Sequence, residues 1–235
     1  MKNKGLLITL EGGEGSGKTT QILRLKSHLI EIGRDVIALR EPGGTTISEQ
    51  IREVVLSNNN FGMSHTTEVL LFQAARSQIY REIVLPSLEL GKVVLMDRSR
   101  DSSLVYQGIV RGFGAQIIEQ LNDLSTKRTY PDLTFLLDIP VEIGMKRRRE
   151  SEEVNRLEQE AMSFHQQVRQ AYLDVARTSM IKDGEDSRWR VVDANQTADQ
   201  VDAEIWQHAS AYLQGHKTKM WQDQLEDSSL DYREE

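Results

Sequence analysis

The segment Leu6–Thr19 constrains the fold more than any other part of the chain. A short, mostly apolar run, Leu6–Leu10, leads into the sequence GGEGSGKT at Gly12–Thr19, and apolar residues at helical spacing follow. A glycine-rich turn of the form G-x-x-x-x-G-K-[ST] between a strand and a helix surrounds phosphate with backbone N–H groups, and the helix adds its positive end. The segment therefore predicts an α/β fold with a nucleoside triphosphate site after its first strand.

Two side chains of this loop have predicted chemical roles. Lys18 would reach the β- and γ-phosphates of the nucleotide, and Thr19 would help to hold Mg²⁺. We expect the whole loop to bind the donor ATP, and its members are Gly12, Gly13, Glu14, Gly15, Ser16, Gly17, Lys18, Thr19 and Thr20. The alternative, a glycine-rich turn without a ligand, does not account for the motif and its strand–helix context together.

The rest of the chain alternates short apolar runs with helical patterns. Strands are predicted at Val36–Leu39, Val93–Met96, Leu133–Leu137 and Arg190–Val192. Helices are predicted from the apolar spacing over Ile22–Ile32, Val69–Ile83 (before Pro86), Leu157–Val175 and Val201–Tyr212. This alternation predicts a single domain over residues 1–214, with the three-layer fold of P-loop NTP hydrolases: a five-stranded parallel sheet with helices on both faces.

The last segment, residues 215–235, differs in composition from the rest. It is acidic and contains few large apolar residues. Such a segment is expected to form a flexible tail. The alternative is a docked terminal helix that uses Met220, Trp221 and Leu225.

Composition limits the class of function. The chain has no cysteine, which excludes disulfides, thiolate metal sites and cysteine nucleophiles. No apolar run is long enough for a signal peptide or a membrane span, so we expect a cytoplasmic protein with no membrane partner. The formal net charge of -7 does not favour nucleic acid as a partner.

The pair Asp97-Arg98 follows the strand predicted at Val93–Met96. An acid at this place is typical of the Mg²⁺-side carboxylate of P-loop proteins, so we expect Asp97 to hold the metal together with Thr19. The arginine beside it suits a second phosphate held opposite the first, because the planar guanidinium binds phosphate oxygens in pairs. A surface salt bridge at a strand end is the simpler alternative.

Several segments resemble the bacterial thymidylate (dTMP) kinases, in the same order along the chain. They are Arg40–Thr45 (REPGGT) with Glu49 and Arg52 behind it, Leu71–Arg76 (LFQAAR), Asp97–Gly108 (DRSRDSSLVYQG), Tyr130–Thr134 (YPDLT) and Asn155–Glu160 (NRLEQE). The resemblance extends from about Leu6 to Tyr212. It implies transfer of the γ-phosphoryl group of ATP to dTMP, which gives ADP and dTDP for dTTP synthesis.

The resemblance implies contacts with the thymine base. Phe72 would stack on the ring, and Arg76 would donate to a thymine carbonyl. Ser103 and Gln107 would hydrogen-bond near the edge of the base. The residues alone also allow Phe72 as ordinary core, Arg76 as the partner of a helix carboxylate such as Glu82, and Gln107 in a solvated loop.

The resemblance also implies contacts with the sugar and the phosphate. Arg52 and Arg98 would hold the acceptor phosphate, and Glu41 would lie near the reacting phosphates or their metal. Glu14 would lie near the sugar 3′-hydroxyl. Tyr106 would crowd the 2′ position and favour deoxyribose, although it could instead pack under a loop.

A short mobile lid is expected at about residues 144–157, where a predicted helix ends in the basic run Lys146–Arg149. Such a lid would exclude water and bring cations to the transferring phosphoryl group. Family members of one type carry an arginine inside the phosphate loop, where this chain has Gly15, so the resemblance implies that the lid supplies this charge. We expect catalytic roles for arginines of the lid, with Arg156 favoured and Arg147 or Arg149 assisting.

The chain departs from the bacterial pattern at a few positions. The lid lacks a glycine between Arg149 and Asn155, and its acids, expected to pair with the arginines in an open state, are Glu150, Glu152 and Glu153. Ala75 and Ser99 stand where many bacterial members have other residue types. Neither change alters the predicted chemistry.

The resemblance also implies a homodimer, and it leaves two alternatives for the activity. The first is the same chemistry on another acceptor, such as dUMP or a nucleoside; a nucleoside kinase would need a base for the 5′-hydroxyl and would have less use for two arginines. The second is a nucleotide-dependent binding switch. A GTPase would need an N-K-x-D segment, which the chain lacks.

Overall fold

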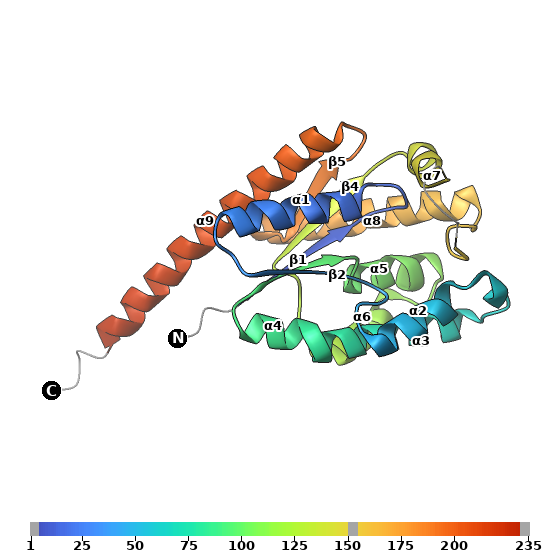
Figure 1. Ribbon diagram of the computed structural model, residues 1–235, viewed down its shortest axis with the longest axis horizontal. Helices are drawn as coiled ribbons and strands as arrows, with labels where there is room; N and C mark the ends of the chain where they lie inside the picture. The colour runs from blue at the N-terminus through green and yellow to red at the C-terminus, as the bar shows by residue number, and fades with distance from the viewer. Residues whose placement is uncertain (1–4, 150–154, 231–235) are drawn as a thin grey trace.

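The computed structural model describes residues 5–149 and 155–230, with residues 149 and 216–230 described as backbone only. Its centre is a parallel sheet in the order β2-β3-β1-β4-β5 (Figure 1). The strands are β1 Leu6–Glu11, β2 Val36–Arg40, β3 Val93–Asp97, β4 Leu133–Asp138 and β5 Trp189–Asp193. Each predicted strand agrees with the structure to within one residue at either end, so the five-stranded parallel sheet is confirmed.

The helices connect these strands and cover both faces of the sheet. The α-helices are α1 Lys18–Glu31, α2 Thr46–Leu56, α3 His65–Ile79, α4 Leu85–Glu89, α5 Arg100–Ser103, α6 Ala115–Thr126, α7 Val141–Arg149, α8 Met162–Asp183 and α9 Ala198–Leu230. Shorter or wider helical turns are η1 Asn58–Asn60, η2 Tyr80–Val84, η3 Leu104–Val110 and η4 Gly184–Asp186. Helices α2 and α6 were not predicted from the sequence.

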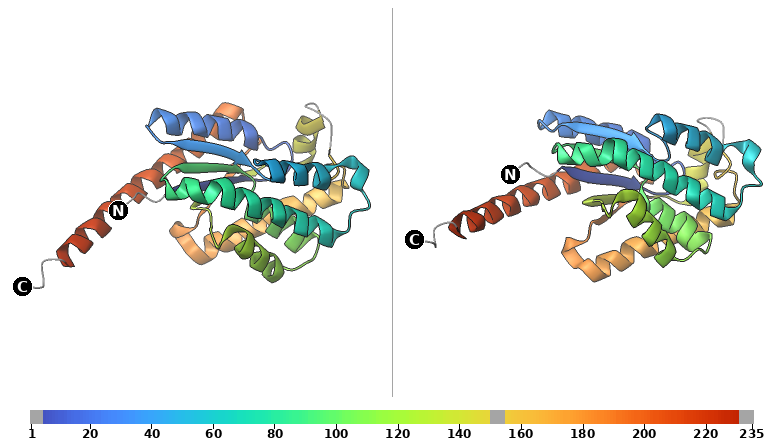
Figure 2. Two further views of the ribbon diagram at one scale, coloured as in Figure 1. Left: turned by 60° about the horizontal axis from the view of Figure 1, so that its bottom comes forward. Right: turned by 90° about the horizontal axis from the view of Figure 1, so that it is seen from below.

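The three layers follow from the alternation of side chains along the buried strands. Leu6, Ile8 and Leu10 of β1 share one core with apolar residues of α1 and α9. Leu7 points to the opposite face and packs with Ile79 and Val84 of the α3–α4 segment, while α8 covers the same face further along (Figure 2). Burying each such side chain contributes roughly 1.5–3 kcal/mol. The predicted three-layer arrangement is confirmed.

The helical segment before β3 runs past Pro86, where the sequence predicted its end. A π-helical turn, Tyr80–Val84, joins α3 to α4, and Pro86 lies in the first turn of α4. Proline has no backbone N–H and its ring crowds the preceding turn. The wider turn directly before it provides the local adjustment that lets the helical segment continue to Glu89.

Two other boundaries differ from the prediction. Helix α8 begins at Met162, not at Leu157, because the residues before it form turns in which Asn155 Oδ1 accepts from the N–H groups of Leu157 and Glu158. Helix α9 continues to Leu230 and extends away from the body of the molecule (Figure 1). That the segment 215–235 is flexible stays a prediction. Part of the predicted lid, including Glu150, Glu152 and Glu153, lies outside the described residues.

The sheet brings three loops to one edge. In the strand register, Leu10 of β1 and Arg40 of β2 both lie beside Asp97 of β3. Parallel strands end at the same edge of a sheet, and ligands of open α/β sheets bind there. The glycine-rich loop after β1, the loop after β2 and the Asp97-Arg98 pair therefore meet.

Candidate active site

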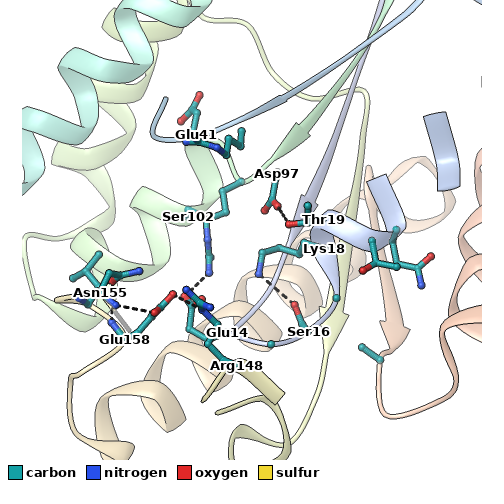
Figure 3. A pocket seen from close by; sticks show the side chains of 18 of the residues that line it. Glu14, Ser16, Lys18, Thr19, Glu41, Asp97, Ser102, Arg148, Asn155 and Glu158 are labelled. Carbon is teal, nitrogen blue, oxygen red and sulfur yellow. Dashed lines mark hydrogen bonds and ion pairs between the residues drawn. The ribbon is translucent and has the colours of Figure 1, made fainter. Parts of the chain in front are cut away.

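A cleft of about 920 Å³ lies at this edge of the sheet (Figure 3). It is lined by segments at the carboxyl ends of β1, β2 and β3, namely Glu14–Gln21, Arg40–Pro42 and Asp97–Arg98, and by side chains of α2, α3, α5, η3 and α7. Two other segments contribute to the lining, one through Asn155, Leu157 and Glu158 and the other through residues between Ala194 and Val201. The volume is near the upper end of the range for small-molecule sites.

The glycine-rich loop has a backbone that only glycine adopts readily. Gly12, Gly15 and Gly17 all have positive φ angles, at 140°, 65° and 89°. Lys18 Nζ lies inside the loop and donates to the carbonyl oxygens of Gly12 at 3.1 Å and Gly13 at 2.8 Å. Burial and the nearby Arg98 lower the pKa of Lys18. The loop therefore presents backbone N–H groups and one ammonium group at the head of α1.

Thr19 and Asp97 form the oxygen pair that the sequence predicted. Thr19 Oγ1 donates to Asp97 Oδ2 at 2.8 Å (Figure 3). Mg²⁺ prefers oxygen ligands and usually keeps several waters and substrate phosphates, so one hydroxyl and one carboxylate suit it. No cluster of three or more His, Cys, Asp or Glu side chains that could hold a metal occurs within residues 5–149 and 155–215.

Arg98 connects the glycine-rich loop to the rest of the cleft. Its φ of 66° lies in the left-handed region, and its side chain turns toward the glycine-rich loop. Nη2 donates to Glu14 Oε1 at 2.6 Å and Nη1 to the Gly12 carbonyl at 3.0 Å. Tyr106 packs under the guanidinium, 5.3 Å from ring centre to Cζ, and its hydroxyl also donates to Glu14. Burial alone would raise the pKa of Glu14, but Arg98 and Lys18 hold it below the ordinary value.

A second arginine lines the cleft from α2. Arg52 Nη1 donates to the Pro42 carbonyl at 2.8 Å, and burial lowers the pKa of this arginine. The loop that it contacts is shaped by Glu49, which accepts from Gly44 N at 2.7 Å and from Arg40 at 3.0 Å. Arg52 and Arg98 thus approach the cleft from different elements, as two ligands for one phosphate must.

Nearly all N–H groups of the Arg76 guanidinium donate hydrogen bonds to other residues of the protein. Nε donates to Glu41 Oε2 at 2.7 Å, and Nη2 donates to the Ser99 carbonyl at 2.9 Å. Nη1 donates to Ser103 Oγ at 2.8 Å and to Asn122 Oδ1 at 2.9 Å. Burial raises the pKa of Glu41 despite the ion pair with Arg76. The guanidinium therefore reaches the cleft in one fixed orientation.

The remaining predicted base contacts also line the cleft. Phe72 is half-buried on α3, and Ser103 and Gln107 line it from α5 and η3. Gln107 Nε2 donates to Glu68 Oε1 at 3.0 Å. An aromatic face, an arginine, a hydroxyl and an amide thus meet where a base would lie.

The arginines of the predicted lid divide into two groups. Arg147 and Arg148 line the cleft; Arg147 donates to the Ala194 carbonyl at 3.1 Å, and Arg148 Nε donates to Glu158 at 2.9 Å. Arg156 does not line it, and the side chain of Arg149 lies outside what the structure describes. Arg156 is buried beside α2 and α3, where it donates to the Val55 carbonyl at 3.0 Å and to Glu68 at 2.8 Å. Neither Arg148 nor Glu158 was singled out from the sequence, although both stand in segments quoted above.

Helix α7 packs directly on the glycine-rich loop. A Cβ atom at Gly15 would overlap the carbonyl oxygen of Gly144, and one at Gly144 would overlap that of Glu14. The loop thus has no room for an arginine at Gly15 while α7 stands here. This agrees with the prediction that the lid, and not the loop, supplies the additional charge.

Comparisons with known proteins agree with this site. A family model described as thymidylate kinase matches residues 10–205. The chain is 45% identical over 205 residues to the thymidylate kinase of Syntrophotalea carbinolica, which covers 85% of this chain and 92% of that protein. It is 42% identical over 214 residues to that of Deinococcus radiodurans, which covers 91% and 100%. The crystal structure of thymidylate kinase from Ehrlichia chaffeensis aligns with a TM-score of 0.68 and 32% identity, over 88% of this chain and 99% of that one. The chain belongs to the thymidylate kinase family.

Proposed function

We infer that the protein is a thymidylate kinase, which transfers the γ-phosphoryl group of ATP to dTMP and releases ADP and dTDP. The observation that carries this inference is one cleft whose lining joins the glycine-rich loop to Arg98, Arg52 and the aromatic face of Phe72. A site for a triphosphate alone would have no use for the second half.

The donor half would bind ATP along the loop Gly12–Thr20. Backbone N–H groups and Lys18 would hold the β- and γ-phosphates, and Thr19 and Asp97 would hold Mg²⁺. When bound there, Mg²⁺ would supply positive charge that neutralises the phosphates. The adenine end would lie toward the lining segment Ala194 to Val201.

The acceptor half would bind dTMP with its base against Phe72. Arg76, Ser103 and Gln107 would contact the base edge, and Arg52 and Arg98 the phosphate. We propose that Glu14 lies near the 3′-hydroxyl, that Tyr106 crowds the 2′ position, and that Glu41 lies near the reacting phosphates. These are the acceptor residues expected from the sequence, and all their side chains line the cleft.

The reaction needs positioning and charge, not a covalent intermediate. A phosphate oxygen of dTMP is already a competent nucleophile, so no general base is required, and the γ-phosphoryl group passes to it in line. We propose that Arg147, with Arg148, supplies the positive charge that stabilises the transferring phosphoryl group, because both side chains line the cleft. A role for Arg156 at the phosphates requires a lid conformation in which its side chain leaves Val55 and Glu68, whereas a role for Arg149 stays a proposal.

We also propose that the protein acts in the cytoplasm as a homodimer and binds no nucleic acid. None of the described helices is long and apolar enough to cross a membrane. Ile47, Val54 and Leu70, on the packed pair α2 and α3, are about half exposed and offer an apolar surface to a second copy. Analytical ultracentrifugation of the wild type and of Val54→Glu tests this: a dimer that the variant converts to monomers is expected.

The activity is tested by ADP release from ATP and Mg²⁺ with each nucleoside monophosphate, and with thymidine. Fast release with dTMP, slower release with dCMP, dGMP and AMP, and little with thymidine are expected. Arg98→Ala should lose this activity, whereas Arg177→Ala, which removes an exposed arginine of α8 outside the cleft, should keep it. Absence of acceptor-dependent release in the wild type would leave only an ATP-binding protein.

A further inference from the structure

Glu68 is a buried carboxylate that no sequence pattern singled out. It lies near the start of α3 and is 1% exposed. Oε2 accepts from Arg156 Nη2 at 2.8 Å, and Arg111 Nη2 lies 3.5 Å from the same oxygen. Oε1 accepts from Gln107 Nε2 at 3.0 Å. One carboxylate thus contacts an arginine of the predicted lid and a residue that lines the acceptor half of the cleft.

The charge of Glu68 fixes the direction of the Gln107 amide. Burial alone would raise the pKa of Glu68, but hydrogen bonds from Gln107 and Arg156 and the charge of Arg111 hold it below its ordinary value. An ionised carboxylate can only accept hydrogen bonds, so the amide nitrogen of Gln107 must face it. The amide oxygen has no hydrogen-bond partner among the residues that the structure describes. Gln107 therefore offers the cleft an acceptor.

Arg76 offers the opposite polarity. A guanidinium carries donors only, and the hydroxyl of Ser103 accepts from it at 2.8 Å. Ser103, which contacts Arg76, stands one helical turn before Gln107. The donors of Arg76 and the amide oxygen of Gln107 therefore lie close together along one wall of the cleft. A ligand edge that carries an acceptor beside a donor complements this pair.

Pyrimidine bases differ at this edge. Thymine and uracil carry a carbonyl oxygen at C4 beside an N3–H donor, whereas cytosine carries an amino group at C4 beside an N3 acceptor. We propose that Glu68 is a positioning residue that holds the Gln107 amide with its oxygen toward the acceptor base, so that the site favours bases that donate from N3 and disfavours cytosine. The proposal rests on the proposed function, and it assigns a base-selecting role to a residue that does not touch the substrate.

A purely structural role for Glu68 is separable from this one. Arg156 and Arg111 would neutralise the buried carboxylate whichever way the Gln107 amide pointed. Loss of the ion pair should lower stability and scale down activity with every acceptor, because it loosens the same elements. Only loss of the contact to Gln107 should change the ratio between acceptors.

The test is the ratio of kcat/KM for dTMP to kcat/KM for dCMP in Glu68→Gln and in Arg156→Gln. Glu68→Gln lets either end of the facing amide meet Gln107, which can then turn, so the ratio should fall roughly tenfold or more. Arg156→Gln breaks the same ion pair from the other side but leaves Glu68 against Gln107. Its activity should fall with both acceptors, while its ratio stays within about twofold of the wild type.

The double variant Glu68→Gln with Arg156→Met serves if the single variant does not fold, because it removes both charges of the Glu68–Arg156 pair together, while Arg111 keeps its ion pair with Glu160. It should also lose the preference for dTMP. A folded variant of Glu68, single or double, that keeps the wild-type ratio contradicts the assignment to Glu68 and leaves the kinase activity in place. Absence of dTMP-dependent ADP release in the wild type contradicts instead the proposed function.

Discussion

The two halves of the cleft are built in different ways. The donor half is one continuous loop, Gly12–Thr19, whose shape comes from glycine backbone angles between β1 and α1. The acceptor half is assembled from side chains of α2, α3, α5 and η3, held by buried partners from still other elements. A binding site made of backbone depends on local sequence, whereas one made of side chains depends on contacts between distant segments.

The largest effect is expected from Lys18→Met in the donor half. Loss of the ammonium at the β- and γ-phosphates should lower kcat roughly a thousandfold. Equilibrium binding of dTMP should change little, because no predicted acceptor contact involves Lys18. Calorimetric titration with dTMP checks this, and an equal loss of dTMP affinity would show that the halves are not separate.

We expect the free energy of unfolding to depend on pH through Glu11, which lies between the two halves of the cleft. This buried carboxylate at the end of β1 accepts from Ser99 N at 2.8 Å, Ser102 Oγ at 2.6 Å and Tyr172 OH at 2.8 Å. Burial and the nearby Asp101 raise the pKa of Glu11 from 4.5 to about 7.

A raised pKa means that the folded state holds this proton more tightly than the unfolded state. The resulting stabilisation is complete below about pH 4.5 and is lost as the pH rises through about 7. Relative to Glu11→Gln, which has no such proton, the wild type should lose about 2 to 3 kcal/mol of unfolding free energy across this window. Urea unfolding at pH 5 and pH 8 measures the difference, and parallel profiles for the two proteins would refute the assignment.

A smaller effect is expected from Gly15→Ala, which tests the contact between the donor loop and α7. The added methyl group would meet the Gly144 carbonyl and shift the helix that carries Arg147, so kcat should fall about tenfold with KM for dTMP unchanged. Gly33→Ala is the matched control, because Gly33 also has a positive φ but open space within 4 Å of the position that a Cβ would take. Equal losses of kcat in both variants would show that backbone strain, and not the contact with α7, causes the effect.

The smallest effect is expected from Phe72→Leu in the acceptor half. Leucine keeps an apolar side chain but removes the aromatic face, so KM for dTMP should rise about fivefold with KM for ATP unchanged. Steady-state kinetics with each substrate varied in turn gives both values. A rise in KM for ATP alone would place Phe72 on the donor side.

Local patterns predicted the parts of the molecule that depend on neighbouring residues. The strands and the glycine-rich loop follow from short segments, and the structure has them where the sequence indicated. The contact between Thr19 and Asp97 spans 78 positions and was expected only because each residue stands in a motif of P-loop proteins. The acceptor side chains were predicted from the family resemblance, because no spacing rule indicates that they line one cleft. Their roles in binding remain proposals.

The rest depended on contacts across the sequence. Arg156 was favoured for its place in the predicted lid, but its partner Glu68 lies 88 positions away, and no pattern near either residue indicates that pair. The continuation of the helical segment past Pro86 was missed because the proline suggested a helix end, whereas the π-helical turn before it lets the segment continue. The length of α9 was missed because Gly215 and the acidic composition suggested an end that the helix does not have.

The central claim, that one cleft passes a phosphoryl group directly between two nucleotides, is tested most directly by ³¹P NMR of a reaction with ATP, Mg²⁺ and dTMP. We predict that the signals of ADP and dTDP grow together in equal amounts, with no inorganic phosphate beyond that formed without dTMP. Inorganic phosphate in place of dTDP would contradict the claim, because the donor half would then be passing its phosphoryl group to water.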